Sequence, residues 1–214
     1  MNTQQLKHDA LGTTRLVRRD GAAVVERDTR TARYGVGWLA RRLAAREAAV
    51  LRALAGTQHV PQLLGFDGAV VRRSYLAGSP LHRSARPSRK YFAAALRVLR
   101  ALHRAGVAHN DLAKEANWLV TPDGGAAIVD LQLALRSPRR SAHFRRRAYE
   151  DLRHLLKHKL TYQPQHLTSR QKRLLATPTL GTRAWRGFVK PLYRLVTRGL
   201  LRWPERSGAN ERGS

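Results

Sequence analysis

The order of apolar and polar residues along the chain predicts a mixture of short strands and longer helices. Apolar and polar positions alternate around the turn at 19–21, which predicts two strands, Thr13–Val17 and Ala22–Arg27. The same kind of pattern predicts a strand, a tight turn and a second strand between residues 59 and 76. Apolar residues at helical spacing predict helices in four further segments, at 37–55, 88–105, 149–159 and 169–175. The predicted fold class is therefore α+β.

The segment from Gly106 to Ala134 is the most informative part of the chain. It contains a His-x-Asp sequence at 109–111, then Asn117, two short apolar segments and finally Asp130. The apolar segments, at 118–120 and 126–129, are separated by Thr-Pro-Asp-Gly-Gly, so they predict a β-hairpin. This hairpin would place Asn117 and Asp130 side by side, at matching ends of paired strands.

These residue types suit phosphoryl transfer. Asp111 can orient an attacking hydroxyl group and accept its proton, while Asn117 and Asp130 offer oxygen ligands to a magnesium ion that bridges nucleotide phosphates. The simpler interpretation is an ordinary hairpin with polar ends. That interpretation requires His109, Asp111, Asn117 and Asp130 to fall in this order by chance, so we favour the catalytic one.

The sequences HNDLAKEAN at 109–117 and VDLQLA at 129–134 resemble the catalytic motifs of the protein kinase-like superfamily. They are most similar to the small bacterial branch that includes RIO-like kinases and lipopolysaccharide core-sugar kinases, and the pattern extends over residues 12–160. The resemblance implies a minimal two-lobed fold, with a small β-rich N-lobe and a mostly helical C-lobe, that uses ATP and Mg²⁺. It implies that Asp111 is the catalytic base, that His109 is the structural histidine of the loop and that Lys114 reaches the transferred phosphate.

The resemblance also assigns residues to a nucleotide site in the N-terminal part. Arg27 would take the place of the lysine that holds the α- and β-phosphates, with Glu26 as the other candidate for that position. Glu47, the only acidic residue of the helix predicted at 37–55, would form an ion pair with Arg27. Tyr75 and Leu76 would form the interlobe hinge, whose main chain contacts adenine. Alternatively, Arg27 is a solvated strand residue and Glu47 an ordinary charge on the helix surface.

Several departures from the kinase pattern keep a second function open. Five residues separate Asp111 from Asn117, where the usual loop has four, and Leu131-Gln132 replaces the usual Phe-Gly after the metal-binding aspartate. The chain also has no Gly-x-Gly-x-x-Gly loop and no Ala-Pro-Glu sequence, so a plainer hairpin would have to cover the phosphates. These features favour an enzyme of reduced activity, or a pseudokinase that acts as a nucleotide-binding or scaffold module. Asp151 either anchors the catalytic loop from below or interacts with the dipole at a helix start.

The domain boundaries that we expect are 1–76 for the N-lobe, 77–180 for the C-lobe and 181–214 for a basic aromatic segment. That segment contains a predicted helix at 182–203, kinked at Pro191. Residues 1–10 and 205–214 are polar and are expected to be loose.

The charge of the chain adds information about partners. It has 41 Lys and Arg against 14 Asp and Glu, a net charge of +27, which favours anionic partners such as nucleotides, nucleic acids, phospholipid or lipopolysaccharide. Nucleic-acid binding is supported by charge alone, because no RNA- or DNA-binding motif is present. There is no Cys, no signal peptide and no apolar run of membrane-spanning length, so we expect a cytoplasmic protein. Its basic aromatic segment either makes peripheral contact with the anionic inner membrane or packs on the body of the protein with its arginines in water. The expected phosphate acceptor is a hydroxyl group of a protein or of an anionic glycolipid.

Overall fold

The computed structural model describes residues 2–19, 21–84 and 87–177. It confirms an α+β fold, and the chain divides into two compact units, residues 1–155 and 156–214. The basic aromatic segment predicted at 181–214, with its helix at 182–203, lies outside the described residues. No helix in the described ranges combines the length and the apolar character that crossing a membrane requires.

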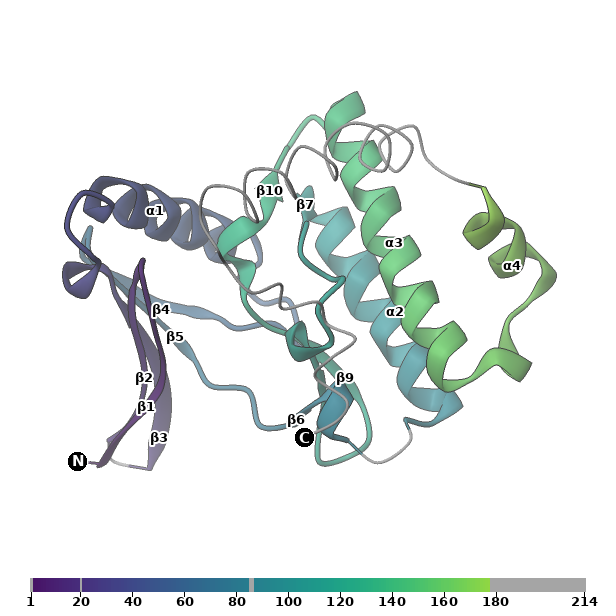
Figure 1. The fold of residues 1–214 in the computed structure, drawn as a ribbon, viewed down its shortest axis with the longest axis horizontal. Coiled ribbons are helices and arrows are strands. Elements are labelled where there is room, and N and C mark those ends of the chain that lie inside the picture. The colour runs from purple at the N-terminus through teal and green to yellow at the C-terminus, as the bar shows by residue number, and fades with distance from the viewer. Residues whose placement is uncertain (1, 20, 85–86, 178–214) are drawn as a thin grey trace, which may run out of the picture. The chain divides into compact units, whose positions relative to one another are not determined.

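The first unit contains a five-stranded antiparallel sheet (Figure 1). Its strands lie in the order β1-β2-β3-β5-β4 and comprise β1 (Asn2–Asp9), β2 (Gly12–Arg19), β3 (Ala22–Asp28), β5 (Val70–Ser74) and β4 (Leu63–Phe66). The strand pairs predicted around residues 19–21 and between 59 and 76 are therefore present.

Strand β1 corrects the expectation that residues 1–10 are loose. It pairs with β2 along its length, from Asn2 opposite Arg18 to Asp9 opposite Gly12, with one irregularity between Gln5 and Lys7. This strand lies at the edge of the sheet and carries mostly exposed polar side chains. Its sequence therefore shows no alternation of apolar and polar residues from which a strand could be predicted.

Helix α1 (Gly37–Ala53) packs on β4 and β5. Its buried face consists mainly of small and aliphatic residues, Ala40, Ala44, Ala48, Val50 and Leu51, together with Glu47. Trp38 and Leu39 are apolar but lie outside this buried face, and they are 67% and 36% exposed. They occupy the first turn of the helix, ahead of the part that contacts the sheet.

The remaining helices and strands frame the segment that carries the sequence motifs. Helix α2 (Arg89–Arg104) begins at Ser88, whose side chain accepts a hydrogen bond from the Tyr91 N–H, and α3 (Ala142–Tyr162) begins earlier than the predicted Tyr149. Short strands form two small sheets, of order β6-β8-β9 and β10-β7. They comprise β6 (Ser79–Pro80), β7 (Val107–Ala108), β8 (Trp118–Val120), β9 (Ala126–Ile128) and β10 (Leu135–Arg136).

Several single-turn 3₁₀ helices complete the described chain: η1 (Thr29–Thr31), η2 (Leu81–Arg83), η3 (Glu115–Asn117), η4 (Leu131–Leu133) and η5 (Pro164–His166). In the second unit, α4 (Ser169–Ala176) matches the helix predicted at 169–175 and begins with a capping box formed by Thr168 and Gln171.

Candidate functional site

The loop between β7 and β8 brings Asp111 and Asn117 together. The Asn117 side chain donates from Nδ2 to the main-chain oxygen of Asp111 at 2.8 Å and to its carboxylate Oδ2 at 3.2 Å. The extra residue in this loop is accommodated by the 3₁₀ turn η3, in which the Asn117 N–H bonds the Lys114 carbonyl oxygen. Lys114 places Nζ 2.7 Å from Asp111 Oδ2, so a carboxylate, an amide and an ammonium group meet at one point.

Asp151 on α3 anchors this loop, which decides between the two interpretations of that residue. Its carboxylate is 1% exposed and accepts the backbone N–H groups of His109 at 2.7 Å and Asn110 at 2.9 Å. His103 lies 3.3 Å from the same carboxylate. The fully buried His109 ring bonds the Val129 carbonyl oxygen through Nε2 at 2.9 Å, so it ties the loop to the strand that precedes Asp130.

The predicted hairpin is present and carries Asn117 and Asp130 at matching ends. Trp118 pairs with Ile128, and the Val129 N–H continues the pairing with a bond to the Asn117 carbonyl oxygen at 3.1 Å. Asp130 follows with φ at 63°, a left-handed conformation that is uncommon for a residue with a side chain and is often kept at functional sites.

The side chains of this pair suit a magnesium ion. Within the described part of the chain, the Asp130 carboxylate makes no hydrogen bond or ion pair, and Oδ1 of Asn117 accepts none. The described residues contain no group of three or more His, Asp or Glu that could hold a metal ion. Magnesium sites that act on nucleotides commonly take only one or two protein ligands and complete their coordination with phosphate and water, so a pair of this kind fits.

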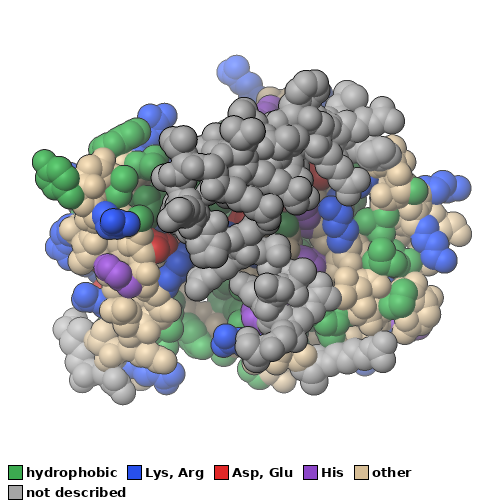
Figure 2. All heavy atoms as spheres, in the orientation of Figure 1, with side chains coloured by type: hydrophobic (Ala, Val, Ile, Leu, Met, Phe, Trp, Pro, Cys, Tyr) green, Lys and Arg blue, Asp and Glu red, His purple; other side chains and the backbone are tan. Residues whose placement is uncertain are grey.

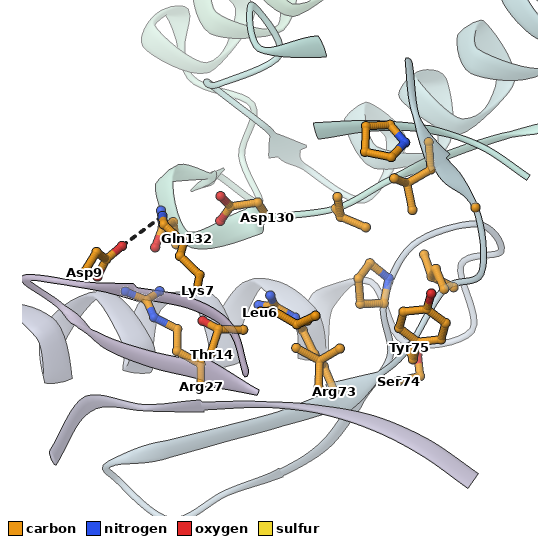
Figure 3. A pocket seen from close by; sticks show the side chains of 17 residues that line it. Leu6, Lys7, Asp9, Thr14, Arg27, Arg73, Ser74, Tyr75, Asp130 and Gln132 are labelled. Carbon is orange, nitrogen blue, oxygen red and sulfur yellow. Dashed lines mark ion pairs between the residues drawn. The ribbon is translucent and has the colours of Figure 1, made fainter. Parts of the chain in front are cut away.

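A pocket of about 270 Å³ lies between Asp130 and the five-stranded sheet. In Figure 3, Asp130 lies on one side of it, and Thr14, Arg27 and Arg73 lie on the opposite side. Its apolar lining includes Leu6, Val25, Pro61, Leu76, Leu119 and Val129. Such a lining suits a flat aromatic base, and the polar end suits charged groups.

The two predicted hinge residues, Tyr75 and Leu76, both line this pocket. The Tyr75 N–H is bonded to the Ala23 carbonyl oxygen, whereas the Leu76 N–H has no hydrogen-bond partner among the described residues. An unpaired main-chain donor beside an apolar slot is the kind of group that binds the edge of a base.

The ion pair predicted between Arg27 and Glu47 is present. Arg27 Nη1 lies 3.1 Å from Glu47 Oε2, and the two residues are 6% and 0% exposed. The alternatives of a solvated strand arginine and a surface glutamate are therefore wrong. Glu26, the other candidate for the phosphate-binding position, pairs with Arg72 and is not part of this ion pair. Burial lowers the pKa of Arg27, and the carboxylates of Asp130 and Asp9 partly offset that effect.

The sequence interpretation missed Arg73, a second cation of the same cluster. Arg73 Nη1 forms an ion pair with Glu47 Oε1, and its side chain is 13% exposed. Burial lowers the pKa of Arg73 to about 10, with Asp130 acting against that shift and Arg27 adding to it, so the group remains charged at neutral pH. The signal available was the repeated Arg at 72–73 in a strand, where one of two neighbouring side chains must face inward.

Three further polar residues of the pocket, Lys7, Asp9 and Gln132, were not predicted as site residues. Lys7 Nζ lies 2.8 Å from Asp9 Oδ2, the pair marked in Figure 3. Burial of Asp9 raises its pKa, but the hydrogen bonds from Lys7 and the Leu11 N–H and the charges of Lys7 and Arg27 outweigh this, so the pKa lies below the usual value. Strand β1 therefore contributes to the pocket alongside Thr14 on β2 and Val25 and Arg27 on β3.

Helix α1 is also tied to the segment that carries Asp130. Arg46 on α1 donates from Nε to the Ala134 carbonyl oxygen at 2.7 Å, one residue beyond η4. Glu47 and its neighbour therefore link one helix both to the sheet and to the chain after Asp130.

Comparison with models of known protein families and with curated proteins found no match for this sequence.

Proposed function

We propose that the chain is an ATP- and Mg²⁺-dependent phosphotransferase with a minimal, two-lobed kinase-like fold. The observation that carries this proposal is the arrangement around Asp111. Its carboxylate contacts Asn117 and Lys114, and Asn117 pairs with the strand end before Asp130, which lines the pocket and has no hydrogen bond or ion pair among the described residues. A catalytic base, a pair of metal ligands and an adjoining pocket for the nucleotide are the parts that phosphoryl transfer requires.

In this proposal the adenine ring of ATP occupies the apolar slot beside Tyr75 and Leu76. The phosphates of ATP extend from there toward Arg27. Asn117 and Asp130 would hold Mg²⁺, which neutralises charge on the phosphates when bound. Asp111 accepts the proton of the acceptor hydroxyl group while the oxygen of that hydroxyl group forms a bond to the γ-phosphorus. The bond between the γ-phosphorus and the bridging oxygen of the β-phosphate breaks, and ADP leaves. Lys114, beside Asp111, stabilises charge on the transferred group.

The acceptor that we propose is a hydroxyl group of a protein Ser or Thr or of a lipopolysaccharide core sugar. The net charge of +27 favours an anionic acceptor, and Figure 2 shows Lys and Arg side chains spread over the described surface of the visible face. The same charge supports the proposal of a cytoplasmic protein with peripheral contact to an anionic membrane.

A pseudokinase is the second candidate, favoured by Arg27. A guanidinium group is a planar fork and not the compact charge that a lysine provides, and Gln132 replaces the glycine after Asp130-Leu131. Such a protein would bind nucleotide without turnover and act as a nucleotide-binding or scaffold module.

The test is ATP turnover by the purified chain with Mg²⁺, with a generic protein and lipopolysaccharide core as acceptors. We expect Asp111→Ala to abolish turnover, while the matched control Asp123→Ala, in the exposed β8–β9 turn, leaves it intact. Nucleotide binding without turnover would support the pseudokinase, and the absence of both would refute the nucleotide site.

A further inference from the structure

A feature that the proposed function does not use is the second arginine on Glu47. The register of the sheet explains why Arg73 is there: β3 and β5 place Arg73 opposite Val25 and Val71 opposite Arg27. Because directly opposed side chains point to the same face, Arg27 and Arg73 lie on the inner face of the sheet. Arg72 points to the outer face, where it pairs with Glu26.

The ion pair between the sheet and α1 joins one carboxylate to two arginines. Glu47 is fully buried, Arg27 contacts its Oε2 at 3.1 Å, and Arg73 contacts its Oε1. A second buried guanidinium group carries a large desolvation cost and repels the first, and one carboxylate cannot neutralise both. The buried cluster of Arg27, Arg73 and Glu47 therefore keeps an excess positive charge beside the pocket.

The remaining donors of Arg73 are available to a ligand. A guanidinium group has five N–H donors, and Glu47 is the only partner of the Arg73 side chain among the described residues. Arg73 lines the pocket and immediately precedes Ser74, Tyr75 and Leu76, which line it as well.

The charge of Asp130 does not neutralise the excess positive charge of the cluster of Arg27, Arg73 and Glu47 when a metal ion is bound. Asp130 is the acidic group whose charge acts on both arginines, but in the proposed function its carboxylate is occupied by Mg²⁺. Once that cation is bound, the carboxylates left to act on the two arginines among the described residues are Glu47 and Asp9, and Asp9 is already paired with Lys7. A nucleotide phosphate group offers the missing negative charge and acceptors that match the planar donors of a guanidinium group.

We propose that Arg73 binds the phosphates of the nucleotide together with Arg27, so that two arginines sharing Glu47 do what one lysine does in a conventional kinase. This inference rests on the proposed nucleotide site. It makes Arg73 a binding residue for the α- and β-phosphates, and it leaves the recognition of the base to the slot beside the hinge.

The test compares Arg73→Met with Arg72→Met, a matched change on the adjacent residue that faces the other side of the sheet. The full chain is titrated by calorimetry with Mg–ATP, Mg–ADP and adenosine. We expect Arg73→Met to raise the Kd for ATP and for ADP by about tenfold or more, the effect of one lost charge-assisted hydrogen bond, and to leave the Kd for adenosine unchanged. Arg72→Met should change none of the three.

Two outcomes would overturn the inference while leaving the nucleotide site in place: Arg73→Met behaves like Arg72→Met, or it weakens adenosine as much as ATP. If the wild-type chain binds no nucleotide, both the proposed function and the role of Arg73 in phosphate binding are refuted. Binding without turnover leaves the inference standing.

A conservative pair covers the case in which Arg73→Met does not fold. Arg73→Lys keeps the charge but loses the planar fork, so it should weaken ATP and ADP more than the matched Arg72→Lys does, again without an effect on adenosine. Equal affinities in these two variants would contradict the phosphate contact. Circular dichroism and thermal melting of each variant verify that the fold is intact before titration.

Discussion

Replacement of Asp151 tests whether the loop between β7 and β8 is held from α3. Its carboxylate is 1% exposed and accepts two backbone N–H groups, from His109 and Asn110. Hydrogen bonds to a charged group contribute about 1.5–3 kcal/mol each. Asp151→Asn keeps one acceptor but turns an amide N–H₂ toward the other donor, so we expect a loss of about 2–3 kcal/mol in the free energy of unfolding. Asp151→Ala leaves both donors buried without a partner, and we expect about 4 kcal/mol.

Urea unfolding at neutral pH measures both losses, and thermal melting should show a decrease of about 2–4 °C per kcal/mol. Arg147→Ala, at an exposed position of the same helix, is the control and should stay within about 0.5 kcal/mol of wild type. The reasoning is refuted if Asp151→Asn matches that control, or if Asp151→Ala is no worse than Asp151→Asn.

Three further predictions concern parts of the fold around the site. Hydrogen bonds from the Arg30 side chain hold the pKa of Asp28 below its usual value, so this carboxylate contributes stability above about pH 4 that is lost on further acidification. Asp28→Asn should therefore reduce the loss of stability at acidic pH, measured by urea unfolding at a series of pH values. An unchanged loss of stability at acidic pH would contradict this prediction. Gly12 has φ at 126°, and a Cβ there would overlap the carbonyl oxygen of Asp28 at the end of β3, so Gly12→Ala should cost about 2 kcal/mol or more in urea unfolding. A neutral result would argue against the close approach of Gly12 to β3. Leu102→Ala should cost about 2–5 kcal/mol in thermal or urea unfolding, because Leu102 is fully buried, whereas Arg100→Ala on the exposed side of α2 should cost little.

The sequence predicted most of what depends on local pattern. The hairpin after Asn117 followed from two short apolar segments and a Thr-Pro-Asp-Gly-Gly turn, and helix α2 followed from its apolar spacing and from Ser88. The ion pair between Arg27 and Glu47 was also predictable, because Glu47 is the only acid of its helix and a resemblance suggested its partner.

The features that were missed depend on pairing between distant segments. Strand β1 has no apolar face of its own and is identified only by its pairing with β2, so Lys7 and Asp9 could not be placed in the pocket. The inward direction of Arg73 and the outward direction of Arg72 depend on the register of β5 against β3, which the sequence of β5 does not specify. For Asp151, anchoring of the loop was one of two predicted interpretations, and the choice between them required knowing which turn of α3 lies against the loop.

The shared carboxylate of Glu47 restricts how this part of the chain can change over evolutionary time. Three positions on three elements, Arg27 on β3, Arg73 on β5 and Glu47 on α1, form one buried charge cluster. Loss of Glu47 alone would leave two buried guanidinium groups unpaired, whereas loss of either arginine still leaves the glutamate with a partner. An arginine must therefore be replaced before the glutamate can be, and the effects of such substitutions should be strongly non-additive. A lineage that exchanged Arg27 for a lysine would be expected to replace Arg73 first.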